Sequence, residues 1–356
     1  MSVILRNVQI PLFIKIETKI LRDIRKIMDE HHLNFQKPLI LSEQHILELG
    51  GNEIVNAFHN PATVLVKENS VAEALAIAQE VQTKGNDLII SIGGGRVLDV
   101  GKYAATKARV NYISVPTTPS NDGICSPVSV LKNEDGKTGS LSVNMPIGVL
   151  VDTQMLVNAP AQNIRAGIGD LISNFSAISD WKLAYAQGKE DMDDFAASIA
   201  YSATELIYQT CRGLTLNLRN EEFLAKLTHG LILAGIAMNI AGNSRPCSGS
   251  EHEISHAIDL LFPGKSMHGL QVAFGTVYAD FLRKKDITVL IGFLKSVELP
   301  FTYVELNLTE DEIIQAILKA PATRPERYTI LEHLNMNEAT VRRSIQEYTE
   351  YVEQYR

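Results

Sequence analysis

The stretch DLIISIGGGRVLDVGK, residues 87–102, indicates the fold class of this chain. It opens with an apolar, isoleucine-rich run typical of a buried strand, and it continues through three glycines into apolar residues at helical spacing. A strand that leads through a glycine turn into a helix is typical of parallel sheets covered by helices. We therefore predict an α/β fold around this stretch.

The surrounding sequence extends the pattern on both sides and then changes character. Further strands are predicted at residues 38–42, 62–67, 112–115 and 147–152, and a helix at residues 71–84. After about residue 153, helical patterns dominate, at residues 169–186, 192–211, 221–240 and 339–354. We predict an α/β domain with a parallel sheet over residues 1–155, an all-α domain over residues 156–356, and an active site in a cleft between them.

Composition and charge exclude several classes of protein. The chain has 356 residues, enough for two domains, and its net charge of −8 is spread along the sequence, which argues against a nucleic-acid partner. Its three cysteines are odd in number and widely spaced, which favours a reducing compartment. The N-terminus lacks a signal-peptide core, and no apolar run approaches the ~18 residues needed to span a membrane. A soluble cytoplasmic protein without membrane insertion is predicted.

The triple glycine predicts a site for a dinucleotide. Because Gly93, Gly94 and Gly95 have no Cβ, backbone N–H groups at a helix N-terminus can approach a pyrophosphate closely. The alternative is that the glycines only form a tight turn, and the pattern matches neither GxGxxG nor GxxxxGK[ST]. The next strand also ends in a polar loop, PTTPSNDGICSP at residues 116–127. Both loops are expected at the carboxyl edge of the sheet, where α/β proteins bind ligands.

The helical half contains a candidate metal site. His252 and His256 are four residues apart and therefore share one face of a helix, while Asp170 and His268 lie beside glycines. A carboxylate with two imidazoles is a common set of ligands for a divalent metal. The pattern leaves open the alternative that these histidines are hydrogen-bonded core residues.

Several long motifs resemble one superfamily of enzymes. They are SIGGGRVLDVGKYAA, VPTTPSNDGICSPVSVL, GIGDLISNFSAISDWKLA, and SRPCSGSEHEISHAIDLL followed by MHGLQVAFGT. In this order, between about residues 35 and 280, they resemble the glycerol dehydrogenase, iron-type alcohol dehydrogenase and dehydroquinate synthase superfamily. Within it they are most similar to sn-glycerol-1-phosphate dehydrogenases. The resemblance implies a dehydroquinate synthase-like fold: an α/β domain that binds NAD or NADP, and an all-α domain that holds one divalent metal and the substrate.

The resemblance also implies roles for single residues. The metal ligands would be Asp170, His252 and His268. The catalytic residues would be His256, facing the substrate, and Asp122, between cofactor and substrate. Cofactor-binding positions would be Gly93, Gly94, Gly95, Asp99, Thr117, Thr118, Ser120 and Ser126. Iron-type relatives carry a histidine four residues after the ligand aspartate, where this chain has Asn174. Three protein ligands with an open position make zinc the first expectation, with nickel and iron as alternatives.

The implied function is a metal-dependent, NAD(P)-linked oxidoreductase that interconverts dihydroxyacetone phosphate and sn-glycerol 1-phosphate. One alternative is a glycerol or polyol dehydrogenase. Another is a dehydroquinate synthase-like lyase, although that group generally has Glu where this chain has Asp170. A third is a non-catalytic NAD-binding protein, which would have no need of three metal ligands. The expected partner is a small polyol or its phosphate, and a homo-oligomer is compatible with the sequence. Spacing identifies no residue for a substrate phosphate. In relatives the first strand commonly ends in an acidic residue that contacts the adenine ribose, whereas here it ends in Ser42-Glu43, so the choice of NAD or NADP stays open.

Overall fold

The computed structural model describes residues 8–59, 61–212 and 217–355. The N-terminal stretch in which no signal peptide is predicted begins with residues 1–7, which lie outside these ranges. By contacts between residues the chain divides into two compact units. Unit 1 consists of Met1–Ile164 and Leu218–Ile240, and unit 2 of Arg165–Asn217 and Ala241–Arg356.

Unit 1 is built on a six-stranded, entirely parallel sheet, as predicted. The strands are β1 (Phe13–Glu17), β2 (Pro38–Ser42), β3 (Ala62–Leu65), β4 (Leu88–Gly93), β5 (Asn111–Pro116) and β8 (Gly148–Asp152), in the order β1-β8-β5-β4-β2-β3. Every residue of β2, β4 and β8 is buried. Strands covered on both faces read as continuous apolar runs, which is why the sequence shows them clearly.

Three strands are absent from the sequence prediction. The edge strand β1 reads FIKIE, and its charged residues interrupt the apolar run that marks the central strands. The other two, β6 (Val128–Lys132) and β7 (Thr138–Ser142), form a separate antiparallel hairpin, and much of their surface is polar. Edge and hairpin strands are partly exposed, so their sequences carry a weaker signal.

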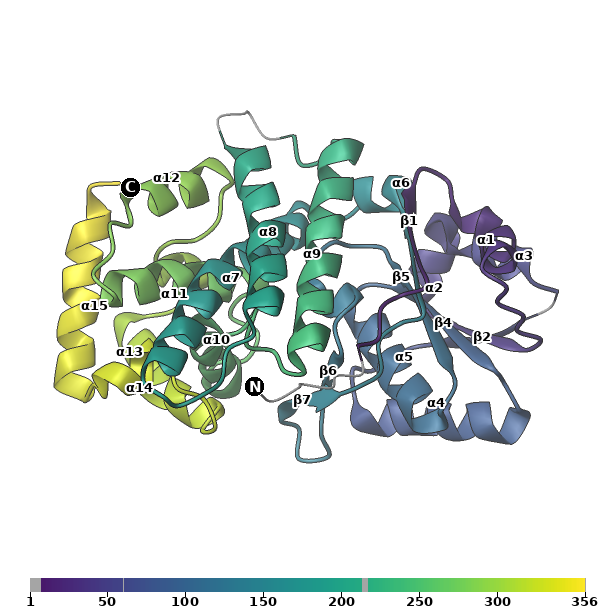
Figure 1. Ribbon diagram of the computed structural model, residues 1–356, viewed down its shortest axis with the longest axis horizontal. Helices are drawn as coiled ribbons and strands as arrows, with labels where there is room; N and C mark the ends of the chain where they lie inside the picture. Colours follow the sequence, from purple (N-terminus) through teal and green to yellow (C-terminus); the bar gives the residue numbers. More distant parts are fainter. Residues whose placement is uncertain (1–7, 60, 213–216, 356) are drawn as a thin grey trace. The chain divides into compact units, whose positions relative to one another are not determined.

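Helices cover both faces of the sheet (Figure 1). Leu39 and Leu41 of β2 belong to the core formed with α4 (Val71–Lys84) and α5 (Gly95–Ala108). Ile40, between them, belongs to the core formed with α1 (Ile24–Glu30) and α3 (Asn52–Ala57). Successive side chains of a strand point to opposite faces, so one buried strand contributes to two cores. The short helices α2 (Gln44–Ile46) and α6 (Thr153–Val157) follow β2 and β8.

One long helix of the C-terminal half packs in unit 1. This helix, α9 (Glu221–Ala241), lies so close to the loop after β5 that a Cβ at Gly235 would be 2.6 Å from the carbonyl oxygen of Cys125. By length and composition α9 could cross a membrane, contrary to the prediction that no apolar run is long enough, but 72% of its apolar window is buried inside the protein. Unit 1 therefore contains two separate segments, whereas the predicted domains meet at one boundary after residue 155.

Unit 2 is helical, and its described residues contain no strand. Its helices are α7 (Ala161–Ala186), of which residues from 165 onward belong to this unit, α8 (Asp194–Cys211), α10 (Ser250–Leu261), α11 (His268–Leu282), α12 (Thr288–Ser296), α13 (Glu310–Lys319), α14 (Ile330–Leu334) and α15 (Glu338–Glu353). The predicted combination of a parallel α/β part and a helical part is confirmed.

Candidate metal centre and cofactor site

Asp170, His252 and His268 meet in unit 2. They come from α7, α10 and the first position of α11, and one ligand atom from each lies within 4.8 Å of the other two. The Nε2 atom of His268 is 3.7 Å from Oδ1 of Asp170. Oxygen and imidazole donors at these separations suit a divalent transition metal such as zinc, nickel or iron. The three side chains therefore fit the metal that the sequence predicts.

His256 lies beside the two candidate ligand histidines and is not part of the group of three. Its ring centroid is 6.2 Å from that of His252 and 6.3 Å from that of His268, whereas the rings of His252 and His268 are 4.9 Å apart. The predicted substrate-facing role of His256 is compatible with this position beside the ligand group, and it stays a prediction.

Burial favours the neutral form of all three histidines. Desolvation lowers the pKa of His268, and it lowers the pKa values of His252 and His256 well below the usual value. The charges of Arg324 and Arg327 add to the effect on His252 and His256. A neutral imidazole keeps the lone pair that a metal ligand needs.

Glu251 supports His252 from within the protein. This carboxyl is fully buried, and burial raises its pKa. Its Oε1 accepts a hydrogen bond from the backbone N–H of Gly249 and lies 3.0 Å from Nδ1 of His252. Carboxylates that contact the second nitrogen of a ligand histidine fix the orientation of the ring.

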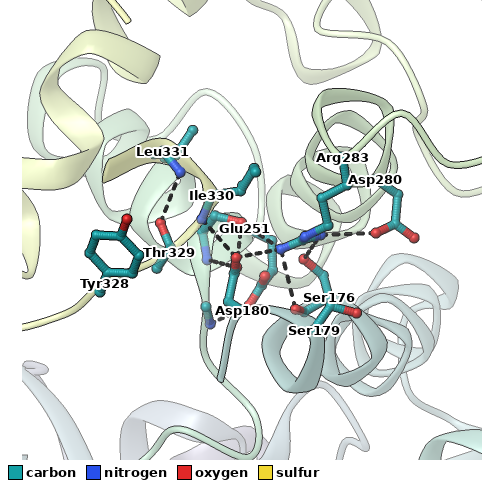
Figure 2. Close-up of polar contacts among 12 residues, drawn as sticks. Ser176, Ser179, Asp180, Glu251, Asp280, Arg283, Tyr328, Thr329, Ile330 and Leu331 are labelled. Carbon is teal, nitrogen blue, oxygen red and sulfur yellow. Dashed lines mark hydrogen bonds and ion pairs between the residues drawn. The ribbon is translucent and has the colours of Figure 1, made fainter. Parts of the chain in front are cut away.

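Asp180 ties together the three helices that carry the candidate ligands. It lies on α7, and its Oδ2 accepts hydrogen bonds from the backbone N–H and the hydroxyl of Ser250, at the start of α10. Its Oδ1 forms an ion pair of 2.6 Å with Arg283, which follows α11, and accepts a hydrogen bond from the N–H of Ile330. Figure 2 shows Asp180 between Ile330 and Arg283. Because Asp180 is fully buried, these contacts fix the helices with little competition from water.

The structure gives a different account of each of the three consecutive glycines at residues 93–95. A Cβ at Gly93 would lie 2.7 Å from the Cβ of Val97, so glycine is required there by the packing of the protein itself. A Cβ at Gly94 would be 3.6 Å from the hydroxyl of Thr118, an ordinary contact, and one at Gly95 would be 3.9 Å from Asn121. None of the three has a positive φ. The fold thus does not require Gly94 and Gly95, whereas a ligand lying against the N-terminus of α5 would explain them.

The loop after β5 places polar side chains near these glycines. The backbone N–H of Thr117 donates to the carbonyl of Gly93, which joins the two loops directly. The hydroxyls of Thr117 and Thr118 are buried without a hydrogen-bond partner in the described structure. Buried hydroxyls normally have partners, so these two fit a site in which a ligand supplies them. Ser120 is partly buried, and Ser126 is buried with its hydroxyl 3.4 Å from the carbonyl of Val128.

A buried lysine outside the predicted set of site residues contacts this loop. Lys102 is 1% exposed, and its Nζ lies 3.1 Å from the carboxylate of Asp99 and donates to the carbonyls of Gly123 (2.8 Å) and Val128 (2.5 Å). The carboxyl of Asp122 is also buried near Lys102 and Asp99, and burial raises its pKa to about 6. The only signal in the sequence was a Lys three residues after an Asp on one helix face.

Glu43, directly after β2, is already paired. It accepts a hydrogen bond of 2.7 Å from Nε of Arg96, a residue in the first turn of α5. An acidic residue and an arginine therefore lie together beside the triple glycine. The pair contains both kinds of group that contact the adenine ribose in dinucleotide sites, a carboxylate for a 2′-hydroxyl and an arginine for a 2′-phosphate.

Comparisons with known proteins assign the family. A model of iron-containing alcohol dehydrogenases matches residues 15–160. The glycerol-1-phosphate dehydrogenase [NAD(P)+] of Methanosphaera stadtmanae is 37% identical over 333 residues, which cover 92% of this chain and 93% of that protein. The chain belongs to the glycerol-1-phosphate dehydrogenase family. The enzyme of the same name from Archaeoglobus fulgidus is 35% identical and covers 92% of the chain and 94% of its own length.

Solved structures agree on the fold of this glycerol-1-phosphate dehydrogenase family member. A probable glycerol dehydrogenase from Sinorhizobium meliloti matches with a TM-score of 0.78 and 20% identity, covering 99% of this chain and 100% of that one. Glycerol dehydrogenase from Schizosaccharomyces pombe matches with a TM-score of 0.76 and 20% identity, over 98% and 92% of the two chains.

Proposed function

We propose that this chain is a metal-dependent, NAD(P)-linked oxidoreductase that interconverts dihydroxyacetone phosphate and sn-glycerol 1-phosphate. The observation that carries the proposal is the convergence of Asp170, His252 and His268 in a chain that shares 33–37% identity over most of its length with glycerol-1-phosphate dehydrogenases. Two features of unit 1 also support a bound dinucleotide. The fold does not require glycine at positions 94 and 95, and the buried hydroxyls of Thr117 and Thr118 have no hydrogen-bond partner in the described structure.

Each group of residues has a distinct role in this proposal. Asp170, His252 and His268 hold the metal, which when bound would polarise the carbonyl of the ketone as a Lewis acid. The glycine turn and the hydroxyls of Thr117 and Thr118 orient the dinucleotide, which supplies the hydride. His256, beside the candidate metal ligands, orients a substrate hydroxyl, and Asp122 lies between the cofactor and the substrate.

The metal assignment can be tested by removing one ligand. His268→Ala is expected to abolish stoichiometric metal binding and turnover, while NADH binding to unit 1 is retained. Elemental analysis and a calorimetric titration with NADH measure the two effects separately. Zinc is the metal we propose first, and reconstitution of the metal-free protein with zinc, nickel or iron compares the candidates. A His268→Ala protein with full metal content and activity would contradict the assignment.

The substrate assignment requires a direct comparison of two ketones. A charge-assisted contact to a phosphate contributes about 1.5–3 kcal/mol, which corresponds to roughly ten- to a hundredfold in kcat/KM if the contact persists in the transition state. We expect the reduction of dihydroxyacetone phosphate to exceed that of dihydroxyacetone by at least this factor, with NADH or NADPH, at equal metal content. Equal efficiency, or a preference for dihydroxyacetone, would favour a glycerol dehydrogenase. Failure to oxidise NADH with either ketone would favour the lyase or the non-catalytic alternative.

We also propose that the protein acts in the cytoplasm as a soluble enzyme on a small polyol phosphate. Cys125, Cys211 and Cys247 are all free and buried. Reduced, inaccessible thiols are typical of proteins from reducing compartments. Fractionation of the cells that express the chain, with detection of the activity in the soluble fraction, tests this point.

A further inference from the structure

The orientation of Gln271 follows from the groups around its amide. Gln271 lies on α11 and is fully buried. Its Nε2 is 2.9 Å from a carboxylate oxygen of Asp259 and 3.2 Å from the carbonyl oxygen of Ser266. Both partners accept hydrogen bonds, so the amide nitrogen must face them and the amide oxygen must face the other way.

That amide oxygen in turn determines how Ser255 uses its only proton. The hydroxyl of Ser255, buried on α10, lies 2.5 Å from Oε1 of Gln271 and 2.8 Å from Nδ1 of His268. A carbonyl oxygen cannot donate, so the contact with Gln271 is a hydrogen bond only if Ser255 donates its proton there. The lone pairs of the same hydroxyl then face Nδ1 of His268.

A serine oxygen that can only accept requires a proton on Nδ1 of His268. In a neutral imidazole the other nitrogen, Nε2, then carries the lone pair. Nε2 is also the atom that lies 3.7 Å from Asp170, on the side of the candidate metal ligands. The direction of three successive hydrogen bonds thus leads from the surface residue Asp259 to the chemical form of His268.

We propose that Asp259, Gln271 and Ser255 form a positioning relay that holds His268 in its Nδ1–H tautomer and so prepares Nε2 to bind the metal. None of the three residues touches the metal in this proposal. It rests on the assignment of His268 as a ligand under Proposed function, but the form of the imidazole can be measured without metal or substrate. Supporting residues of this kind typically contribute ten- to a hundredfold to metal affinity.

The direct test is the tautomer of His268 in the metal-free protein. Long-range ¹H–¹⁵N correlation spectra of protein with ¹⁵N-labelled histidine distinguish protonated from unprotonated ring nitrogens, and the spectrum of His268→Gln identifies the signals of His268. We expect Nε2 to be unprotonated in the wild type. In Gln271→Met the hydroxyl of Ser255 loses its acceptor, turns to donate to Nδ1, and shifts His268 toward the Nε2–H tautomer. Ser255→Thr retains a hydroxyl and should retain the wild-type tautomer.

Metal affinity supplies the second readout. Zinc dissociation constants, measured by competition with a chelator, should rise ten- to a hundredfold in Gln271→Met and Ser255→Ala. Thr276→Val is the matched control, because it removes another buried hydroxyl of α11 that donates only to the carbonyl of Val272, in its own helix. Its zinc affinity should equal that of the wild type.

The outcomes separate this proposal from the proposed function. If folded Gln271→Met and Ser255→Ala proteins keep the wild-type tautomer and bind zinc as tightly as the wild type, the relay is wrong. If either does not fold, Asp259→Ala changes an exposed residue of the same relay, and a shift of the tautomer in the same direction is required of it. If the wild type binds no metal, the metal assignment fails, while the spectra still decide whether the relay sets the tautomer.

Discussion

Gly169 of α7 lies directly against the backbone of Gly269 of α11: a Cβ at Gly169 would be 2.1 Å from the carbonyl oxygen of Gly269. Gly269 approaches α7 equally closely one turn earlier, because a Cβ at Gly269 would be 2.0 Å from the carbonyl oxygen of Ala166. The next residue after Gly169 is Asp170, and the residue before Gly269 is His268. Two glycines thus let two helices touch at the point where each contributes a candidate metal ligand.

We expect Gly169→Ala to separate these ligands. Overpacking of this kind typically destabilises a protein by about 1–3 kcal/mol, and here the helices would move apart beside Asp170. The zinc dissociation constant of the variant should rise at least tenfold, as measured by chelator competition, with a lower urea midpoint. Gly292→Ala in α12 is the control, because among the described residues no atom outside the chain neighbours and backbone of its own helix lies within 4 Å of a Cβ there, and alanine is the better helix former. Unchanged zinc affinity in Gly169→Ala would show that the close approach does not set the ligand geometry.

The adjacent glycines Gly93 and Gly94 should respond to alanine in opposite ways. Gly93→Ala would place its Cβ on Val97 and should lower the thermal midpoint. Gly94→Ala would make only an ordinary contact of 3.6 Å with the hydroxyl of Thr118, so its thermal midpoint should stay within a few degrees of the wild type, while its NADH dissociation constant rises at least tenfold. Gly94→Val should weaken NADH binding further without displacing the metal. Calorimetry that gave wild-type NADH affinity for Gly94→Ala would leave the glycines with only a structural role.

The sequence predicts those features that depend on local pattern or on long motifs. The buried strands β2, β4, β5 and β8 appear as apolar runs, and the predicted helix at residues 71–84 coincides with α4, which begins after the capping residue Ser70 and ends before Gly85. Asp170, His252 and His268 could be named because the resemblance places each in a motif. Their ligand atoms lie within 4.8 Å of one another beside the helix contact at Gly169, and no local pattern in the sequence reveals that contact.

Other features depend on contacts between distant parts of the chain. The position of α9 in unit 1 follows from its contact with Cys125, more than a hundred residues earlier. Asp180 and Gln271 look like ordinary polar residues of amphipathic helices, and only the folded structure shows that both are fully buried. Buried polar residues of this kind are recognised by their partners, because burial without hydrogen bonds would be costly.

We expect Asp180→Asn to loosen the three ligand-bearing helices. The change removes the negative charge from the 2.6 Å partner of Arg283, whose side chain is only 9% exposed and keeps an ion pair of 2.9 Å with Asp280, and breaking one buried ion pair costs on the order of 3 kcal/mol. The free energy of unfolding from urea titrations should fall accordingly, and zinc affinity should fall with it. Asp311→Asn makes the same chemical change in an exposed contact with Arg342 and should have no measurable effect. Equal effects of the two substitutions would show that the Asp180 contacts add nothing beyond a surface pair.

The last prediction concerns how stability changes with pH at Asp122. Burial, with a further contribution from the negative charge of Asp99, raises the pKa of Asp122 to about 6, although the neighbouring Lys102 opposes the shift. In an unfolded chain an aspartate titrates near pH 3.9. Between about pH 4 and pH 6 the folded protein therefore holds this proton more firmly than the unfolded chain does, and the contribution of Asp122 to stability falls as pH rises.

Asp122→Asn is uncharged throughout this range. The thermal midpoint of the variant minus that of the wild type should therefore increase from pH 4 to about pH 7 and then level off, because titrations elsewhere in the protein are common to both. Asp286→Ala is a control of opposite sign: hydrogen bonds from Thr288 lower the pKa of Asp286, so its carboxylate stabilises the fold above the pKa of the unfolded chain, and this contribution is lost toward acid pH. Thermal unfolding at half-unit steps from about pH 2.5 to 8 measures both differences, because the contribution of Asp286 changes below the pKa of the unfolded aspartate and that of Asp122 changes above it. A midpoint difference for Asp122→Asn that is constant, or that decreases toward pH 7, would contradict the raised pKa.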